Sequence, residues 1–85
     1  MTDLEFDILD ELYFVQSYTE LQEKLNFSDN ILKKNLQNLI EKTWVKCFNT
    51  NREEIFEFNI VDFEKNFATL HYLATKEGLL QHNRI

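Results

Sequence analysis

The chain lacks proline and has one glycine and one cysteine in 85 residues. A single cysteine, Cys47, excludes an internal disulfide, and no Cys/His cluster has the spacing of a zinc site. A Gly-rich phosphate loop, a serine nucleophile motif and a Cys/His pair are missing as well. The sequence therefore argues against an enzyme, indicates no metal or cofactor, and fits a reducing, cytoplasmic compartment.

Long apolar runs are also missing. No stretch approaches the roughly 20 apolar residues of a membrane span. The first twelve residues, MTDLEFDILDEL, carry five acidic side chains and no basic one, whereas a secretory signal opens with positive charge. We therefore expect a protein that stays in the cytoplasm and does not enter the membrane.

The chain is instead rich in large apolar and acidic side chains. Hydrophobic residues make up 44% of it, eight residues are Phe, and the formal net charge is -6. This length and composition predict one domain, residues 1–85, with a single modest core. In so small a chain the free energy gained by burying apolar surface nearly equals the entropy cost of ordering the residues. Marginal stability or a stabilising partner is therefore expected.

The first segment has the pattern of a capped amphipathic helix. Thr2 and Glu5 fit a capping box, and apolar residues then recur at helical spacing, which predicts a helix over residues 3–13. The opposite face is strongly negative and is interpreted as a solvated surface. Its residues are Asp3, Glu5, Asp7, Asp10 and Glu11.

Two further helices are predicted over residues 18–25 and 29–42. Ser17 and Glu20 form a second capping box after a short extended link. Ser28 is a favourable N-cap for the next helix, whose apolar positions recur at helical spacing. Two short helices joined by a tight turn, here within residues 18–42, form a helix-turn-helix.

The rest of the chain alternates between strand-like and turn-like segments. Residues 44–48, 55–58 and 69–73 are predicted strands, and residues 49–52 have turn chemistry. Residues 61–68 fit either a helical turn or a folded loop. A short terminal helix over residues 76–82 is expected to be weakened at its start by Gly78.

This order of elements resembles the winged helix-turn-helix domains of bacterial MarR, ArsR and PadR-type regulators. The stretch ELQEKLNFSDNILKKNLQNLIEKTWV matches their helix-turn-helix pattern, and YLATKEG is similar to the motif that ends their wing. The residues in register are Leu21, Leu25, Phe27, Ser28, Ile31, Leu32, Leu36, Leu39, Trp44 and Val45. The resemblance implies an α+β winged helix: a three-helix core, a small antiparallel β-wing at about 44–75 and a short C-terminal helix.

Two features depart from the family pattern. Thr43 stands where the family usually has glycine after the recognition helix, and a β-branched residue at positive φ is an outlier. The helix is therefore expected to end differently here. Residues 49–68 are longer than a simple wing requires and fit either an enlarged wing or a partner surface.

The resemblance implies that the third helix enters the major groove of double-stranded DNA, with neighbouring cations on phosphates. Residues 28–52 carry five basic and two acidic side chains, a local charge of +3 in an acidic chain. The bland alternative is an ordinary solvated helix face. The candidate DNA-binding residues are Ser28, Asn30, Lys33, Lys34, Gln37, Asn38, Lys46 and Arg52.

Three functional hypotheses follow. The first is a DNA-binding transcriptional regulator, for which the resemblance also implies a homodimer. The second is a protein-interaction module without DNA binding, which the net charge, Asp29 and the Glu53–Glu54 pair favour. The third is a DNA mimic built on the acidic first helix. The aromatic-rich C-terminal part is the proposed dimer interface: Phe56, Phe58, Phe63, Phe67, Leu79 and Leu80.

Overall fold

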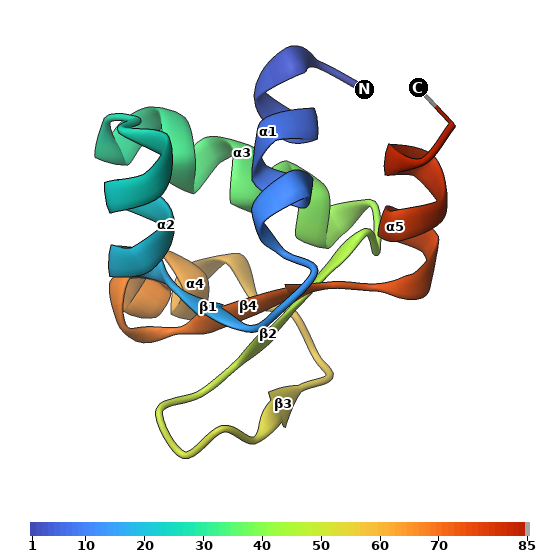
Figure 1. Cartoon of the computed structure of the whole chain (residues 1–85). Helices are drawn as coiled ribbons and strands as arrows, with labels where there is room; N and C mark the ends of the chain where they lie inside the picture. Colours follow the sequence, from blue (N-terminus) through green and yellow to red (C-terminus); the bar gives the residue numbers. More distant parts are fainter. Residues whose placement is uncertain (85) are drawn as a thin grey trace.

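Three helices lead the chain, and short strands and helices alternate after them (Figure 1). The structure, a computed structural model, describes residues 1–84, so residue 85 of the predicted domain lies outside it. The elements are α1 (Asp3–Glu11), β1 (Gln16–Ser17), α2 (Tyr18–Leu25), α3 (Asp29–Glu41), β2 (Val45–Phe48), β3 (Glu54–Ile55), α4 (Ile60–Asn66), the 3-10 helix η1 (Phe67–Thr69), β4 (His71–Ala74) and α5 (Lys76–His82).

The strands form one antiparallel sheet in the order β1-β4-β2-β3. Cys47 of β2 pairs with Tyr72 of β4 on one side and with Ile55 of β3 on the other. Val45 and Cys47 face the core, while Lys46 lies on the other face, as the two-residue period of a strand requires. Because β3 comes last in the strand order, it is an edge strand.

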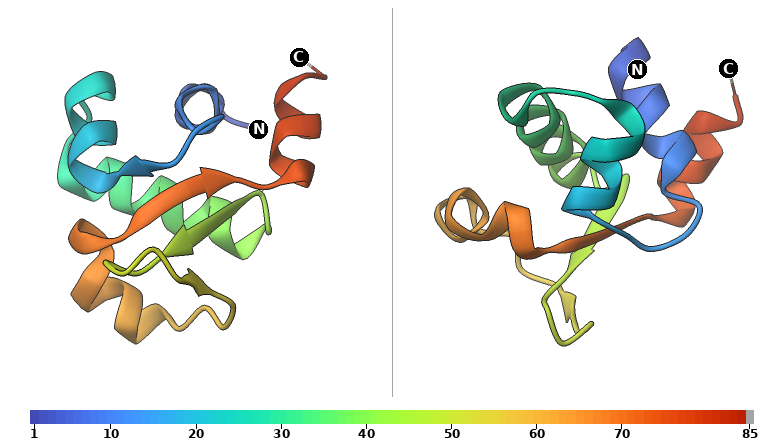
Figure 2. Two further views of the ribbon diagram at one scale, coloured as in Figure 1. Left: turned by 60° about the horizontal axis from the view of Figure 1, so that its bottom comes forward. Right: turned by 60° about the vertical axis from the view of Figure 1, so that its left-hand side comes forward.

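Helices α1, α2 and α3 pack together, α5 lies beside α1, and α4 is set apart at one end of the sheet (Figures 1 and 2). The described residues form a compact α+β domain with five α-helices and a four-stranded antiparallel sheet. Among residues 1–84, every helix is too short or too polar to traverse a lipid bilayer. The largest fully buried side chains are Ile8, Leu9, Leu12, Leu21, Leu32, Leu36, Leu39 and Tyr72.

The predicted helix starts are confirmed by their caps. The Thr2 hydroxyl accepts from the Glu5 amide at 3.1 Å, and the Glu5 carboxylate accepts from the Thr2 amide at 3.0 Å. Ser17 and Glu20 make the same reciprocal pair at 3.1 and 2.9 Å. The helices predicted over 18–25 and 29–42 are confirmed to within one residue.

The first helix differs from its prediction at two points. It ends at Glu11 with Leu12 as its C-cap, and the hydroxyl of Tyr13 beyond the helix lies 2.8 Å from Nδ1 of His82. Glu5 is 2% exposed and therefore does not belong to the solvated acidic face. Its carboxylate accepts a hydrogen bond from Lys42 Nζ at 2.8 Å, so an ion pair joins α1 to the end of α3.

The strand boundaries also need correction. The predicted strand over 55–58 pairs only at Glu54–Ile55, because the chain then leaves the sheet and exposes 84% of Phe56. The strand predicted over 69–73 is His71–Ala74, since Thr69 still belongs to η1. Residues 61–68 lie in α4 and η1. Asn59 caps α4, and Phe63 is buried beneath it.

Helix α3 ends with Thr43 at a φ of 64°. The expectation that the helix ends differently from the family pattern was wrong, because Thr43 adopts the left-handed conformation that glycine favours. The Thr43 amide bonds to the Ile40 carbonyl, and the Trp44 amide bonds to the Leu39 carbonyl at 2.9 Å. These bonds place Trp44 immediately before the first residue of β2.

Candidate interaction surface around helix α3

Helix α3 is fixed by its apolar side and by its N-cap. The Ser28 hydroxyl accepts from the Ile31 amide at 3.4 Å, although Ser28 itself is exposed. Asp29 in the first turn accepts hydrogen bonds from Tyr18 Oη at 2.8 Å and Gln22 Nε2 at 2.7 Å. The Asp29 carboxylate is therefore directed toward α2, and its two hydrogen bonds connect α3 to α2.

Four of the candidate DNA-binding residues lie on the outer side of α3. Asn30 and Lys34 are exposed, whereas Gln37 and Asn38 are half-buried. Their helical spacing places them opposite the buried leucines. This outer side is polar, and Lys34 is its only cation.

Lys33 points toward α4 and not freely to solvent. Its Nζ lies 2.8 Å from a Glu64 carboxylate oxygen and 5.4 Å from the centroid of the Phe67 ring. The sequence analysis missed Glu64, because 31 residues separate it from Lys33 and no local pattern marks the pair. The charge of Lys33 is thus balanced within the molecule.

The two remaining candidates lie on the β2–β3 hairpin. Lys46 Nζ lies 3.7 Å from a Glu54 oxygen and 6.0 Å from the centroid of the Phe48 ring. Arg52 is exposed in the turn at a φ of 66°, and the Asn49 side chain accepts from the Asn51 and Glu53 amides there. Lys46 is balanced by a carboxylate, whereas Arg52 has no ion pair among residues 1–84.

A groove of about 530 Å³ runs between the C-terminal end of α3 and β3, and we call it the α3–β3 groove. The charged residues that line it are Glu41, Glu54 and Lys46, and Lys46 is paired with Glu54. The exposed Phe56 forms part of its wall. The groove is lined by Ile40, Glu41, Thr43, Val45, Lys46, Cys47, Glu54, Ile55, Phe56, Phe58 and Thr75.

The aromatic residues assigned to a dimer interface mostly serve the chain's own core. Phe63 is 2% exposed, and Phe58, Phe67 and Leu79 are partly buried against the core. Only Phe56 and Leu80 of that set are exposed, the latter at 47%. The interface drawn from the sequence therefore needs correction, because its side chains were needed to bury α4, η1 and α5.

Several aromatic residues and Cys47 lie in the core and not on the candidate surface. His82 is buried, stacked on Phe6 at 4.2 Å between ring centroids, so it belongs to the α1–α5 contact. Tyr72 is fully buried and Trp44 partly buried, so both side chains pack in the core. Burial, and secondarily the nearby Glu54 carboxylate, raises the pKa of the Cys47 thiol, which keeps it protonated and a poor nucleophile.

Nothing among residues 1–84 groups three or more His, Cys, Asp or Glu side chains in a position to hold a metal ion. Comparison with protein-family models, curated proteins and solved structures finds no match to this chain.

Proposed function

We propose that the chain is a winged helix-turn-helix domain that recognises a protein, and that it binds a basic, apolar partner segment in the α3–β3 groove. In this topology α2 and α3 are the helix-turn-helix, β2 and β4 are the paired strands of the wing, and β3, α4 and η1 form an insertion between them. The sequence resemblance and the order of elements support the topology.

One observation carries the functional proposal: the lysines that flank α3 are neutralised by carboxylates of the same molecule. Lys33, Lys42 and Lys46 pair with Glu64, Glu5 and Glu54 at 2.8, 2.8 and 3.7 Å. DNA affinity depends on lysines and arginines that are available to phosphates. The pairing leaves Lys34 and Arg52 as the candidate cations without an ion pair among residues 1–84, which supports a weak attraction for phosphate.

The groove has the chemistry of a docking site for a basic partner. Apolar area surrounds Glu41 and Glu54, and the whole chain carries a net charge of -6. Phe56 is 84% exposed beside the edge strand β3, where an extended segment adds main-chain hydrogen bonds. Aromatic side chains of this kind often dominate binding energy at interfaces.

The test uses a labelled peptide of alternating Lys and Leu, a peptide of alternating Glu and Leu, and fluorescence anisotropy. We expect the basic peptide alone to bind, and Phe56→Ser to weaken it about tenfold, the loss of a moderate hot spot. Phe14→Ser is the matched control, because Phe14 is 78% exposed and does not line the groove. Equal weakening by both variants, or equal binding of both peptides, would refute the groove.

DNA binding is the second candidate function. It is favoured by the exposed Asn30 and Lys34 on α3 and by the exposed Arg52 at the hairpin turn. A labelled mixed-sequence duplex, titrated from low to physiological salt, tests it directly. DNA binding predicts a log–log salt slope of about -3 to -5 per monomer, from about 0.9 per phosphate contact.

The matched variants make this second test specific to α3. Lys33→Glu with Lys34→Glu should abolish a salt-dependent signal, whereas Lys76→Glu in α5 with Arg84→Glu just after it changes the net charge equally. Loss in the first pair alone would establish α3 as a DNA reader and overturn the protein-recognition proposal. Absence of duplex binding at low salt supports that proposal.

A further inference from the structure

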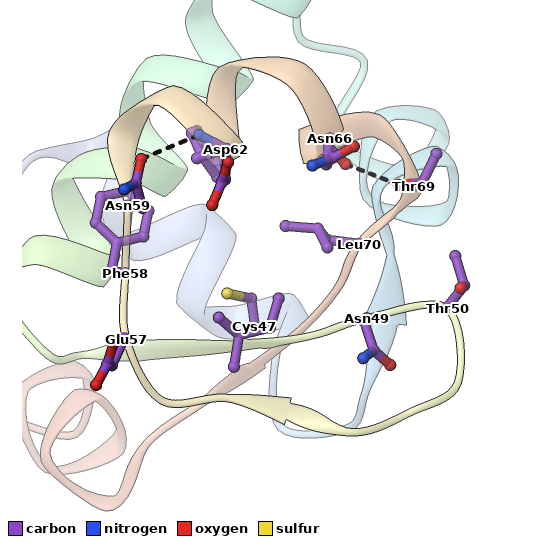
Figure 3. Close-up of a pocket in the computed structure, with 12 residues that line it drawn as sticks. Cys47, Asn49, Thr50, Glu57, Phe58, Asn59, Asp62, Asn66, Thr69 and Leu70 are labelled. Carbon is purple, nitrogen blue, oxygen red and sulfur yellow. Dashed lines mark hydrogen bonds between the residues drawn. The ribbon is translucent and has the colours of Figure 1, made fainter.

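A second hollow, of about 310 Å³, lies between α4, the β2–β3 hairpin and the chain that joins them. We call it the α4 cavity. Ile55 and Phe58 separate it from the α3–β3 groove, since both residues line the two spaces. Figure 3 shows the Asp62 side chain pointing from α4 toward the cavity, which Cys47 and Leu70 also line.

The floor of the α4 cavity is apolar. The buried Cys47, Phe63 and Leu70 form its deepest part, with the partly buried Ile55 and Phe58 beside them. The protonated Cys47 thiol contributes a small, weakly polar surface. A volume of about 310 Å³ lies at the lower end of the range for small-molecule pockets, and it suits one aromatic ring with a short chain.

The rim of the cavity accepts hydrogen bonds and carries only negative charge. Asn59 Oδ1 already accepts from the Val61 and Asp62 amides, and Thr69 Oγ1 donates to the Asn66 carbonyl at 2.9 Å. The Asp62 carboxylate and the Asn66 side chain have no hydrogen-bond or ion-pair partner among residues 1–84. No Lys, Arg or His lines the cavity.

We propose that the α4 cavity binds a small organic cation, a primary ammonium carried on an aromatic body, of the arylalkylamine class. The ring covers Cys47, Phe63 and Leu70, and the ammonium donates to the Asp62 carboxylate and to the side-chain oxygen Oδ1 of Asn66 at the rim. Charge complementarity selects the ammonium over a carboxylate, because an anion meets Asp62 and Glu57 without a compensating cation. The site does not depend on the partner groove.

The experiment titrates the whole chain with phenethylamine, phenethyl alcohol and hydrocinnamate, three ligands that share the ring and differ in charge. Amide and methyl NMR signals report the location of binding. We expect phenethylamine to shift Leu70 and the Asn59 and Asn66 side-chain amides, with affinity about tenfold above that of the neutral alcohol. Hydrocinnamate should bind more weakly still.

Two variants and a control isolate the ammonium contact. Asp62→Asn should weaken phenethylamine about tenfold and leave the alcohol unchanged, whereas Glu64→Gln removes a charge from α4 outside the cavity and should have little effect. Asn66→Asp should tighten phenethylamine, a gain that unfolding cannot produce. Equal affinity for the three ligands, shifts confined to other residues, or no response to both cavity variants would overturn the site.

Discussion

Thr43 is a single residue whose backbone conformation costs stability. Its φ of 64° lies in the left-handed region, which a β-branched side chain adopts at a cost of order 1 kcal/mol. Its carbonyl accepts from Thr75 Oγ1 at 2.7 Å, a bond that glycine would keep. We expect Thr43→Gly to raise the free energy of unfolding by about 0.5–1 kcal/mol in urea titrations.

A glycine elsewhere should act in the opposite sense. Thr50 is exposed in the hairpin turn and does not have a positive φ. Thr50→Gly is therefore expected to lower stability slightly, because it only adds freedom to the unfolded chain. A destabilised Thr43→Gly variant would show that the Thr43 side chain contributes more than its conformation costs.

Glu5 makes stability depend on acid. Burial raises the pKa of its carboxyl, but hydrogen bonds from Lys42 and Thr2 outweigh burial and hold it below the ordinary value. A depressed folded pKa stabilises the protein above the unfolded pKa of about 4.3, and this contribution is lost as pH falls through the folded value. Glu5→Gln should therefore cost about 1–3 kcal/mol at neutral pH and progressively less below about pH 4.

The check is urea unfolding of both proteins across that acidic range. Asp7→Asn removes the same charge from an exposed position on α1 and should leave the shape of the pH profile unchanged. A Glu5→Gln deficit that persists undiminished below the folded pKa would rule out the ionised carboxylate as its source.

At the scale of elements, α5 docks on the chain through Gly78. A Cβ built at Gly78 would lie 2.1 Å from the Trp44 carbonyl oxygen and 2.9 Å from its carbon. The expectation that Gly78 merely weakens the helix misses this close approach, which glycine alone permits. Gly78→Ala should cost about 2–3 kcal/mol, since overpacking against backbone exceeds the helix-propensity gain of about 1 kcal/mol.

Thermal unfolding and Trp44 fluorescence measure this effect. Glu77→Ala, one residue away on the exposed side of the same turn, is the matched control and should change stability by less than about 0.5 kcal/mol. An unchanged melting temperature for Gly78→Ala would mean that α5 can move off Trp44 at no cost.

Local sequence patterns were sufficient to predict most helices and the strand β2. The capping residues Thr2, Ser17 and Ser28 act on amides three positions away, so their pattern is visible in the sequence. The β3 strand was not predicted correctly, because pairing with β2 and the departure of the chain at Phe56 are tertiary events. Propensity alone read Phe56 and Phe58 as strand.

At the scale of the whole molecule, the charge around α3 could not be predicted from sequence neighbours. The count of +3 over residues 28–52 includes Lys33 and Lys42, whose partners Glu64 and Glu5 lie outside that segment. Folding brings these two carboxylates to 2.8 Å and reduces the local charge from +3 to +1. The electrostatic role of the candidate residues depends on carboxylates that no local sequence pattern marks as their partners.

Removal of the carboxylates around α3 is expected to produce a gain of function. The triple variant carries Glu41→Gln, Glu54→Gln and Glu64→Gln. It would release Lys33 and Lys46 from their ion pairs and change the net charge from -6 to -3. We expect the triple variant to acquire non-specific affinity for duplex DNA at low salt. With two or three phosphate contacts available, the log–log salt slope should be about -2 to -3 in anisotropy titrations.

The matched control removes three carboxylates from exposed positions elsewhere: Asp3→Asn, Asp7→Asn and Glu23→Gln give the same net charge. If both triple variants bind DNA alike, net charge and not the pairing of α3 lysines explains the difference from the parent chain. If neither binds, freed lysines are insufficient and the shape of the α3 surface excludes the duplex. Only binding by the first variant alone attributes the acquired DNA affinity to the removal of Glu41, Glu54 and Glu64.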